Sequence, residues 1–421
     1  MLVVTSNWCV SDGTLSAGPP RGCLERFRAE VRRASLRCGF RRDGSYRPLD
    51  AIDVVLAGDT FDWLVSREWT GDVRPWDGSR RAAAARARVV AGALGRSDRL
   101  LATLAAWMRR GIDVPVADRR GRPMPAASQR VPVRVAVLCG DRDRWLEQAA
   151  GDGMRSARAA MVGRCWSDGD VTVRHGDDLD PLHAACGGEP TLGESLAVDL
   201  IARFGLALDD IPEVRPLAAG LVRRLACGTL LDAPTRLVGS LSAHDDGEML
   251  PAAVRQVVID VWHRSVFLWQ RAARRLSPRG SDGVDLVDRI AEWLQWDGDV
   301  EVGRSGRWLD TPPIPDAAAP WDSAATVVLG HPAAEVGAPA AWRRQVVCLG
   351  LGALQSPHHL DDDLLRPAVV VIQPDREGRR IEWLPIDTVV RRIGYERDEE
   401  RCHGVWQSAV SLGRHGIVDA A

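Results

Sequence analysis

The sequence predicts an α/β fold with a largely parallel sheet. Short apolar runs end in polar turns, and arginine-rich amphipathic segments lie between them, which is the alternation expected of such a fold. The composition, with 45% hydrophobic and 27% charged residues, is ordinary for a globular protein. A length of 421 residues suffices for two or three domains, although a large α/β fold can use it as one.

Strands and helices are expected to alternate in the first half of the chain. Short apolar runs predict strands at 1–5, 51–57, 131–139 and 171–174. A helix is expected at 24–36, where Phe27, Val31 and Leu36 form an apolar stripe, and a long or broken helical region at 78–110. The stretch 114–130 is rich in Pro, Gly and Arg and is predicted to be a loop.

The second half begins with a change of pattern at about residue 191. Helices are predicted at 195–204, 216–226, 252–276 and 284–294. Strand-like runs return at 325–329, 345–351, 368–372 and 381–384. We therefore expect one α/β core, formed by 1–190 and 311–421, that is interrupted by a helical insertion at 191–310.

The charged residues exclude several classes of function. No lysine occurs, so all 55 basic residues are arginines, which excludes a phosphate-binding loop lysine and Schiff-base chemistry. A net charge of -2 argues against a general nucleic-acid binder. The chain has no run of eighteen apolar residues, its first residues lack a basic n-region, and its nine cysteines are scattered. We expect a cytoplasmic protein without a transmembrane segment.

Four predicted strands are followed by residues that can bind metal ions. The polar residues at these strand ends are Gly58-Asp59, Gly140-Asp141-Arg142, His175-Gly176 and Gly330-His331. Because α/β folds place ligands beyond the carboxyl ends of parallel strands, we expect these side chains to converge. Carboxylates together with imidazoles suit Mn, Fe or Zn.

Two of these segments carry a resemblance to a known family. Residues 56–64 look like the motif G-D-x-x-D, and 175–181 are similar to a motif built on a lone histidine. On these motifs the sequence resembles the calcineurin-like metallophosphoesterases, and within them the UDP-2,3-diacylglucosamine diphosphatase type. The resemblance covers roughly 1–190 and 320–385. It implies a four-layer α/β/β/α sandwich, two metal ions bridged by Asp59, and a lid formed by the insertion.

The match to the family's metal ligands is uneven. The family's motifs read S-D-x-H, G-D-x-x-D, G-N-H-[DE], a lone His, and G-H-x-H. One family metal site corresponds here to Asp59, Asp141, His175 and His331, all of which are competent ligands. The other is reduced, because Asn7 and Cys9 stand where the first motif has Asp and His, and Ala333 stands where the last motif has its second His.

A rival alignment of the first motif remains open. It uses Ser11 and Asp12 and so keeps an aspartate, but it leaves a gap after the first strand, and we prefer the alignment on Asn7. With that alignment the resemblance implies one divalent ion rather than two. Cys9 is then a candidate further metal ligand.

The resemblance implies a metal-dependent hydrolase acting on a small phosphate ester or diphosphate with an impaired or single-metal centre. Arg142 cannot be an acid or base, because its pKa is above about 12, but it can pair with a phosphate, and Asn7 is a second candidate for contact with phosphate. The alternative is an inactive homologue that serves as a phosphate-binding, regulatory or protein-interaction module.

Further polar residues have weaker predicted roles. Asp62 and Asp143 are expected to orient ligands or cap a helix rather than to bind metal, and His183 is expected near the site in a structural role. The pair His358-His359 is predicted to lie in a solvated turn. The tryptophans of the insertion, including Trp262, Trp269, Trp293 and Trp296, are expected in its core, with any exposed subset offering a surface for a protein partner.

Overall fold

The computed structural model describes most of the first three hundred residues and four short segments after them. The described residues are 1–16, 18–19, 22–41, 43–69, 71–146, 161–169, 171–180, 182–183, 190–226, 233–242, 250–276, 281–295, 326–331, 346–349, 369–375 and 378–384. The predicted turn at His358-His359, the position Ala333, and the residues from 386 onward lie outside them.

The larger of two main sheets has six strands. In spatial order these are β14 (Gly378–Leu384), β13 (Val369–Asp375), β1 (Leu2–Thr5), β3 (Ile52–Ala57), β7 (Val133–Leu138) and β8 (Met161–Gly163). The strands β1, β3, β7 and β8 pair in parallel, whereas β13 and β14 run antiparallel to their neighbours. The predicted strands at 1–5, 51–57, 131–139, 368–372 and 381–384 are thus found here, with shifted ends.

The second sheet has four strands. In spatial order these are β12 (Val346–Cys348), β11 (Thr326–Leu329), β10 (Val171–Arg174) and β9 (Cys165–Asp168). β10, β11 and β12 are parallel, and β9 is antiparallel to β10. Both sheets are therefore largely parallel, as the alternation of strands and helices indicates.

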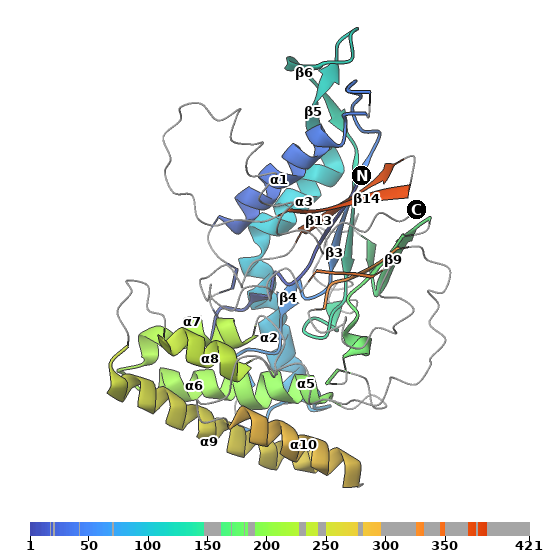
Figure 1. The fold of residues 1–421 in the computed structure, drawn as a ribbon. Coiled ribbons are helices and arrows are strands. Elements are labelled where there is room, and N and C mark those ends of the chain that lie inside the picture. Colours follow the sequence, from blue (N-terminus) through green and yellow to red (C-terminus); the bar gives the residue numbers. More distant parts are fainter. Residues whose placement is uncertain are drawn as a thin grey trace.

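The two sheets pack face to face. Their shared core includes Val4 and Val55 from the larger sheet and Val173 and Val328 from the smaller one. The opposite face of the larger sheet is covered by α1 (Cys23–Arg37), α2 (Arg80–Arg96) and α3 (Asp98–Arg110) (Figure 1). The α/β class is thus confirmed. The described residues show three of the layers, helix, sheet and sheet, while the complete four-layer sandwich stays a prediction.

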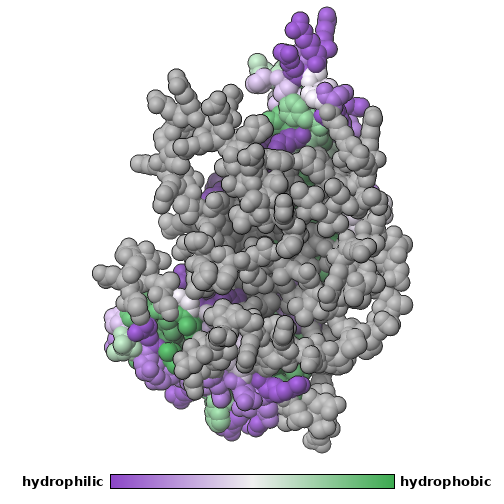
Figure 2. Space-filling model, in the orientation of Figure 1, coloured by the Kyte–Doolittle hydropathy of each residue, from purple (hydrophilic) through white to green (hydrophobic). Residues whose placement is uncertain are grey.

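A separate helical unit follows the second sheet's central strand in sequence. Its helices are α5 (Leu192–Ser195), a π-helix (Leu196–Ala202), α6 (Arg203–Asp209), α7 (Arg215–Ala226), α8 (Ala233–Ser242), α9 (Ala252–Leu276) and α10 (Ser281–Leu294). They surround a hydrophobic core of their own that contains Phe204, Trp262 and Trp269. They lie together below the sheets in Figure 1, and Figure 2 shows hydrophilic side chains over their outer side.

Three ion pairs join the described residues of the helical unit to loops of the α/β core, and one of them pairs Arg67 with Asp209. Glu194 accepts at 2.8 Å from Arg144, and Asp199 accepts at 2.8 Å from Arg74. Glu194 also completes a capping box with Thr191, so the start of α5 is fixed both locally and to the core. The insertion is therefore held beside the loop that begins at Gly140.

The described tryptophans of the insertion pack in its core, whereas Trp296 lies outside the described residues. Trp262 and Trp269 are buried, and Trp293 is partly buried against the same core. Trp262 and Trp269 also donate their indole N–H groups internally, to the carbonyl of Leu294 and to Ser195. None of the described helices is long and apolar enough to cross a membrane.

The loop predicted at 114–130 is wrong, because the chain forms a β-hairpin there. Its strands are β5 (Ile112–Ala117) and β6 (Pro123–Val131), which pair only with each other and extend away from the main sheet (Figure 1). Proline is tolerated at the edge of a sheet, and both strands of a two-stranded sheet are edges. The helix α8 was also not predicted.

Candidate metal centre

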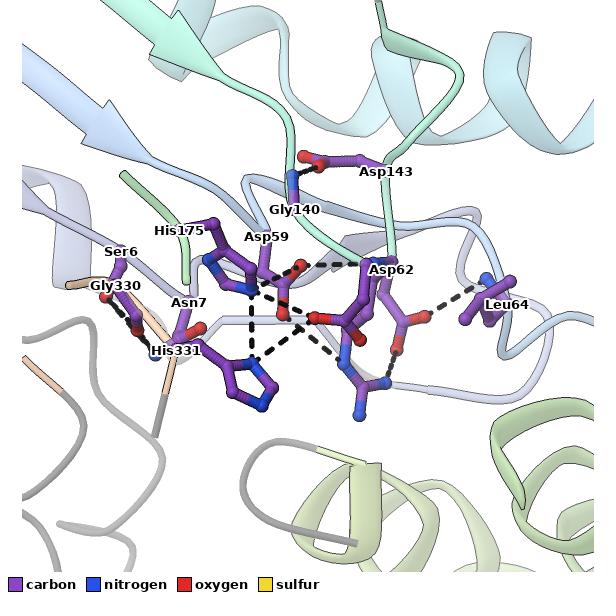
Figure 3. A network of polar contacts seen from close by, with 12 residues as sticks. Ser6, Asn7, Asp59, Asp62, Leu64, Gly140, Asp143, His175, Gly330 and His331 are labelled. Atoms are coloured by element: carbon purple, nitrogen blue, oxygen red, sulfur yellow. Dashed lines mark hydrogen bonds and ion pairs between the residues drawn. The ribbon is translucent and has the colours of Figure 1, made fainter. Parts of the chain in front are cut away.

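Five strands that end at one edge of the packed sheets carry the predicted site. Asn7 follows β1, Asp59 follows β3, Asp141 follows β7, His175 follows β10 and His331 follows β11. In the smaller sheet the parallel ladder continues past the strands, since the backbone N–H of His331 donates to the carbonyl of His175 at 2.7 Å. The convergence expected from the strand ends is therefore present (Figure 3).

Four buried side chains form a group that could hold a metal ion. His175 Nε2 lies 2.9 Å from Asp141 Oδ1 and 3.4 Å from Asp59 Oδ1. His331 Nδ1 lies 3.3 Å from His175 Nε2 and 3.4 Å from Asp141 Oδ1. Metal–ligand bonds of 2.0–2.2 Å place neighbouring ligand atoms about 2.8–3.6 Å apart in octahedral or tetrahedral geometry. The donor types and their spacing both fit a bound divalent cation.

The outer ring nitrogen of each histidine faces an oxygen acceptor. His175 Nδ1 lies 2.8 Å from the carbonyl oxygen of Ala57, and His331 Nε2 lies 2.9 Å from Asp180 Oδ2. A histidine that donates one N–H in this way presents the lone pair of its other nitrogen. In the metal-free chain these contacts aim Nε2 of His175 and Nδ1 of His331 at the same point.

Carboxylates dominate the electrostatics of this group. Burial alone would lower the pKa of His175 and His331, but Asp59 and Asp141 raise the pKa of His175 well above its ordinary value, and Asp141 and Asp180 raise that of His331 to about 9. Burial alone would raise the pKa of Asp141, yet His183, His175 and His331 hold it well below its ordinary value. The group therefore attracts positive charge, which protons supply in the absence of a metal.

The backbone at the site is held in an uncommon conformation. Among the described residues, the non-glycine residues with positive φ are Asn7 (57°), Cys9 (46°) and Asp59 (51°), and all three lie at this sheet edge. Two parallel backbone contacts hold them together, since Cys9 N donates to Asp59 O at 2.9 Å and Asn7 N to Gly58 O at 3.3 Å. Such conformations persist only where surrounding structure enforces them, and they concentrate at functional sites.

Gly58 is required beside Asp59 for two reasons. Its φ is 89°, and a Cβ at this position would lie 2.3 Å from His175 Nδ1. A side chain here would displace the imidazole that faces Asp59.

Arg142 lies on the other side of Asp59 and is buried. Its Nε is 3.6 Å from Asp59 Oδ2, its Nη1 is 3.3 Å from Asp62 Oδ2, and its backbone N–H donates to Asp59 Oδ1 at 3.1 Å. Burial alone would lower the pKa of Arg142, but Asp62, followed by Cys9, Asp141 and Asp59, raises it above its ordinary value. The guanidinium is thus a permanent cation next to Asp59.

Asn7 lies at the sheet edge, but its side chain hydrogen-bonds to the backbone and to Ser6 rather than to the metal-capable group. Its Nδ2 donates to the carbonyl of Gly330 at 3.1 Å and to Ser6 Oγ at 3.2 Å. Aspartate could not make these donations, so the amide has a structural reason to be there. Cys9 is buried and contributes to the raised pKa of Arg142, and among the described residues it belongs to neither metal-capable group.

The rival Asp12 is directed elsewhere. It accepts from Thr14 and from Ser66 Oγ, outside both metal-capable groups of the described residues. Asn7, in contrast, lies beside Gly58 and Gly330 at the sheet edge.

Asp62 and Asp143 organise the two loops next to the group. Asp62 accepts the backbone N–H groups of Leu64 and Val65 at 3.2 Å in addition to pairing with Arg142. Asp143 accepts from Gly140 N at 2.7 Å and from Phe61 N at 3.1 Å, and burial, followed by the charge of Asp59, raises its pKa to about 7. Both therefore position backbone, and neither is part of the metal-capable groups found in the described residues.

Sequence reasoning missed the roles of Asp180 and underestimated His183. Asp180, His183 and His331 form a second buried group of ligand atoms. The only signal in the sequence was the density of acidic and imidazole residues in the stretch 175–183, because the direction of each side chain depends on the turn that follows β10.

Comparison of the chain with protein-family models, with curated proteins and with solved structures finds no match.

Proposed function

We propose that the chain is a metal-dependent phosphoesterase-like hydrolase that acts on a small phosphate ester or diphosphate. The observation that carries the proposal is the group of Asp59, Asp141, His175 and His331, whose donor atoms lie 2.9–3.4 Å apart where measured, next to a buried arginine. The resemblance of 56–64 and 175–181 to metallophosphoesterase motifs supports it further.

The four residues are assigned one divalent ion, of the Mn, Fe or Zn type that mixed carboxylate and imidazole ligands favour. When bound, it would supply Lewis-acid chemistry by neutralising charge on a phosphoryl oxygen. Asp59 and Asp141 hold the negative charge that binds it, and Ala57 and Asp180 orient the histidines.

Arg142 is assigned to the phosphate itself. Its guanidinium has five N–H donors, of which Nε faces Asp59 and an Nη1 donor faces Asp62. The remaining donors can pair with phosphate oxygens, which supplies orientation and charge but no proton. Asn7 is assigned a supporting role in phosphate binding, through its hydrogen bond to the carbonyl of Gly330.

The alternative, an inactive phosphate-binding module, is favoured by one observation. Asp59 Oδ2, an oxygen of the carboxylate that the family's two ions share, faces the guanidinium of Arg142 here. A chain that bound a metal ion at the four-residue group only in order to bind phosphate could have the same contact between Asp59 and Arg142.

Metal analysis of the purified chain, combined with turnover of bis-p-nitrophenyl phosphate, separates the two. We expect at least one equivalent of metal, with turnover that disappears in Asp59→Ala and His331→Ala. Asp12→Asn is the control, because Asp12 lies outside both groups. Absence of bound metal, or turnover unchanged by Asp59→Ala, would contradict the hydrolase. Bound metal with no turnover would favour the binding module.

A further inference from the structure

His331 lies between two different sets of ligand-type atoms. Its Nδ1 faces His175 Nε2 and Asp141 Oδ1 at 3.3 and 3.4 Å, which is the group described above. Its Nε2 lies on the other side of the ring, 2.9 Å from Asp180 Oδ2. Histidine can bind a metal through either nitrogen. Both sides of this imidazole are thus surrounded by further donors.

The second set consists of Asp180, His183 and His331. All three are buried, and one ligand atom from each lies within 4.8 Å of the other two. Asp180 and His183 come from one tight turn after β10, in which Asp180 N donates to Asp177 O at 3.0 Å and His183 N to Asp180 O at 2.9 Å. Asp180 Oδ1 accepts the N–H of Leu182 at 2.9 Å, which leaves Oδ2 directed at His331.

His183 has an unusual environment for a structural histidine. Its side chain is only 4% exposed, and its Nδ1 is buried without a hydrogen-bond partner among the described residues. Its Nε2 lies 3.5 Å from Asp141 Oδ2. Leaving a buried polar atom unpaired costs about 1–3 kcal/mol. A histidine with only a packing role at this position would therefore destabilise the fold.

The helical insertion holds this ring in place. Gly193 of α5 packs directly on it, since a Cβ on Gly193 would lie 2.0 Å from His183 Cε1. The N–H of Gly193 also donates to the carbonyl of Leu182 at 2.7 Å. The imidazole is thus held on one side by the turn after β10 and on the other by Gly193 of α5, which has no side chain to displace it.

We propose that Asp180, His183 and His331 form a second cation site, which shares His331 with the first as an imidazolate whose ring protons are released to solvent when both ions bind. Two imidazoles and a carboxylate suit Zn, Mn or Fe. This site uses Asp180 and His183 on the Nε2 side of His331, so it is not the half that the family resemblance assigns to Asn7 and Cys9. The proposal concerns metal binding and does not require the chain to hydrolyse phosphate esters.

The test counts metal ions in the full chain. After loading with Zn²⁺ or Mn²⁺ and removal of unbound ions by gel filtration, elemental analysis of the wild type is expected to give two equivalents. His183→Gln and Asp180→Asn are each expected to give one. Asp59→Asn is also expected to give one, because it affects only the first group. His263→Gln, a histidine of α9 outside both groups, serves as the control and is expected to keep two.

The possible results distinguish this site from the proposed function. One equivalent in the wild type, lost in Asp59→Asn and kept in His183→Gln, would mean that Asp180 only orients His331, and would overturn the second site alone. One equivalent that is lost in His183→Gln and kept in Asp59→Asn would support the second site and overturn the metal assigned to the proposed hydrolase. No metal in the wild type would overturn both.

A measurement on the wild type covers the case in which a variant does not fold. Two Mn²⁺ ions that share one imidazole are close enough to couple magnetically, so the electron paramagnetic resonance spectrum of the Mn²⁺-loaded chain should show a coupled pair. A spectrum of isolated Mn²⁺ at full loading would overturn the proposal. Circular dichroism of each variant in a chelator shows whether it is folded.

Discussion

The two sides of Asp59 meet the same requirement in different ways. On one side its Oδ1 faces His175, within a group whose donors lack a permanent cation. On the other side its Oδ2 faces the guanidinium of Arg142, which carries its charge at every pH at which the protein folds. A buried carboxylate needs a positive neighbour, and here one neighbour belongs to the chain while the other has to be bound. The Oδ1 side of Asp59 can therefore lose its cation, whereas the Oδ2 side cannot.

The largest effect, on metal affinity and turnover, is expected at the Oδ1 side of Asp59, which faces His175. His175→Gln removes a ring nitrogen that lies 2.9 Å from Asp141 and 3.3 Å from His331. Loss of a residue that only orients a ligand typically costs 10–100-fold in metal affinity or activity, so loss of a ligand should exceed about 100-fold. Chelator competition would measure the affinity and bis-p-nitrophenyl phosphate the turnover. Unchanged values for both would remove His175 from the ligand set.

The arginine side should respond in stability rather than in metal content. Arg142→Met leaves Asp59 and Asp62 buried without their cation, which should lower the free energy of unfolding by about 3–5 kcal/mol. Arg88→Met is the matched control, because Arg88 pairs with Glu68 at 2.6 Å at the surface, and its loss should leave the free energy of unfolding nearly unchanged. Urea unfolding measures both. Equal losses would show that the guanidinium is not a buried counter-ion.

The free energy of unfolding of the metal-free chain should depend on pH through the histidines of the metal-capable group. His331 has a pKa of about 9 in the fold, against about 6.5 when unfolded, so its protonated form stabilises the fold. That stabilisation, about 3 kcal/mol, is complete below pH 6.5 and is lost as the pH rises to 9.

Bound metal should remove this decline, because a ligating histidine has already lost its proton. The measurement is urea unfolding at several pH values between 6 and 9, with a chelator and with saturating metal. Parallel curves in the two series would contradict the assignment of His331 as a ligand.

A smaller effect is expected where the insertion packs on His183. Gly193→Ala forces a Cβ into the imidazole and should destabilise the fold by about 1–3 kcal/mol. Gly220→Ala in α7 is the control with the opposite sign. No atom lies within 4 Å of the new Cβ there, so alanine should stabilise the helix by up to about 1 kcal/mol. Thermal unfolding of both variants checks the contrast, which fails if they shift in the same direction.

The smallest effect is expected at Asn7. Asn7→Asp restores the aspartate that the resemblance places there but loses the donation to Gly330 O, which still accepts from Ser6 Oγ at 3.1 Å. Stability should fall by about 1 kcal/mol and the number of bound metal ions should not change, because Arg142 already faces Asp59 Oδ2. A gain of one metal equivalent would show that Asn7 alone had disabled the family's other site.

Sequence reasoning located the strand ends because their signal is local. An apolar run followed by Gly-Asp or Gly-His needs no tertiary information to be noticed, and Asp59, Asp141, His175 and His331 do converge. The strands β5 and β6 were missed because their prolines suit a loop equally well. The helix α8 was missed because its Pro, Gly and Ser content is poor for a helix, while Leu237 and Leu241 stabilise it by packing into the insertion's core.

Residues that act through side-chain direction were beyond the sequence. Asp180 and His183 differ from many other acidic and imidazole residues only in the turn that directs them inward. For Asn7 the resemblance predicts an aspartate at this position, but the sequence does not reveal that the amide donates to a carbonyl more than three hundred residues away. The first depends on the geometry of a local turn, and the second on contact between distant segments.

The direct pairing of β10 with β11 also has a consequence for biosynthesis. His175 and His331 are 156 residues apart, and the whole helical insertion is translated between them. Because chains emerge from the ribosome in sequence order, Asp59, Asp141 and His175 are made long before their last partner. Closing so long a loop is slow, and compaction of the insertion around its own core shortens the span. The centre is therefore completed only after the helical insertion has been made.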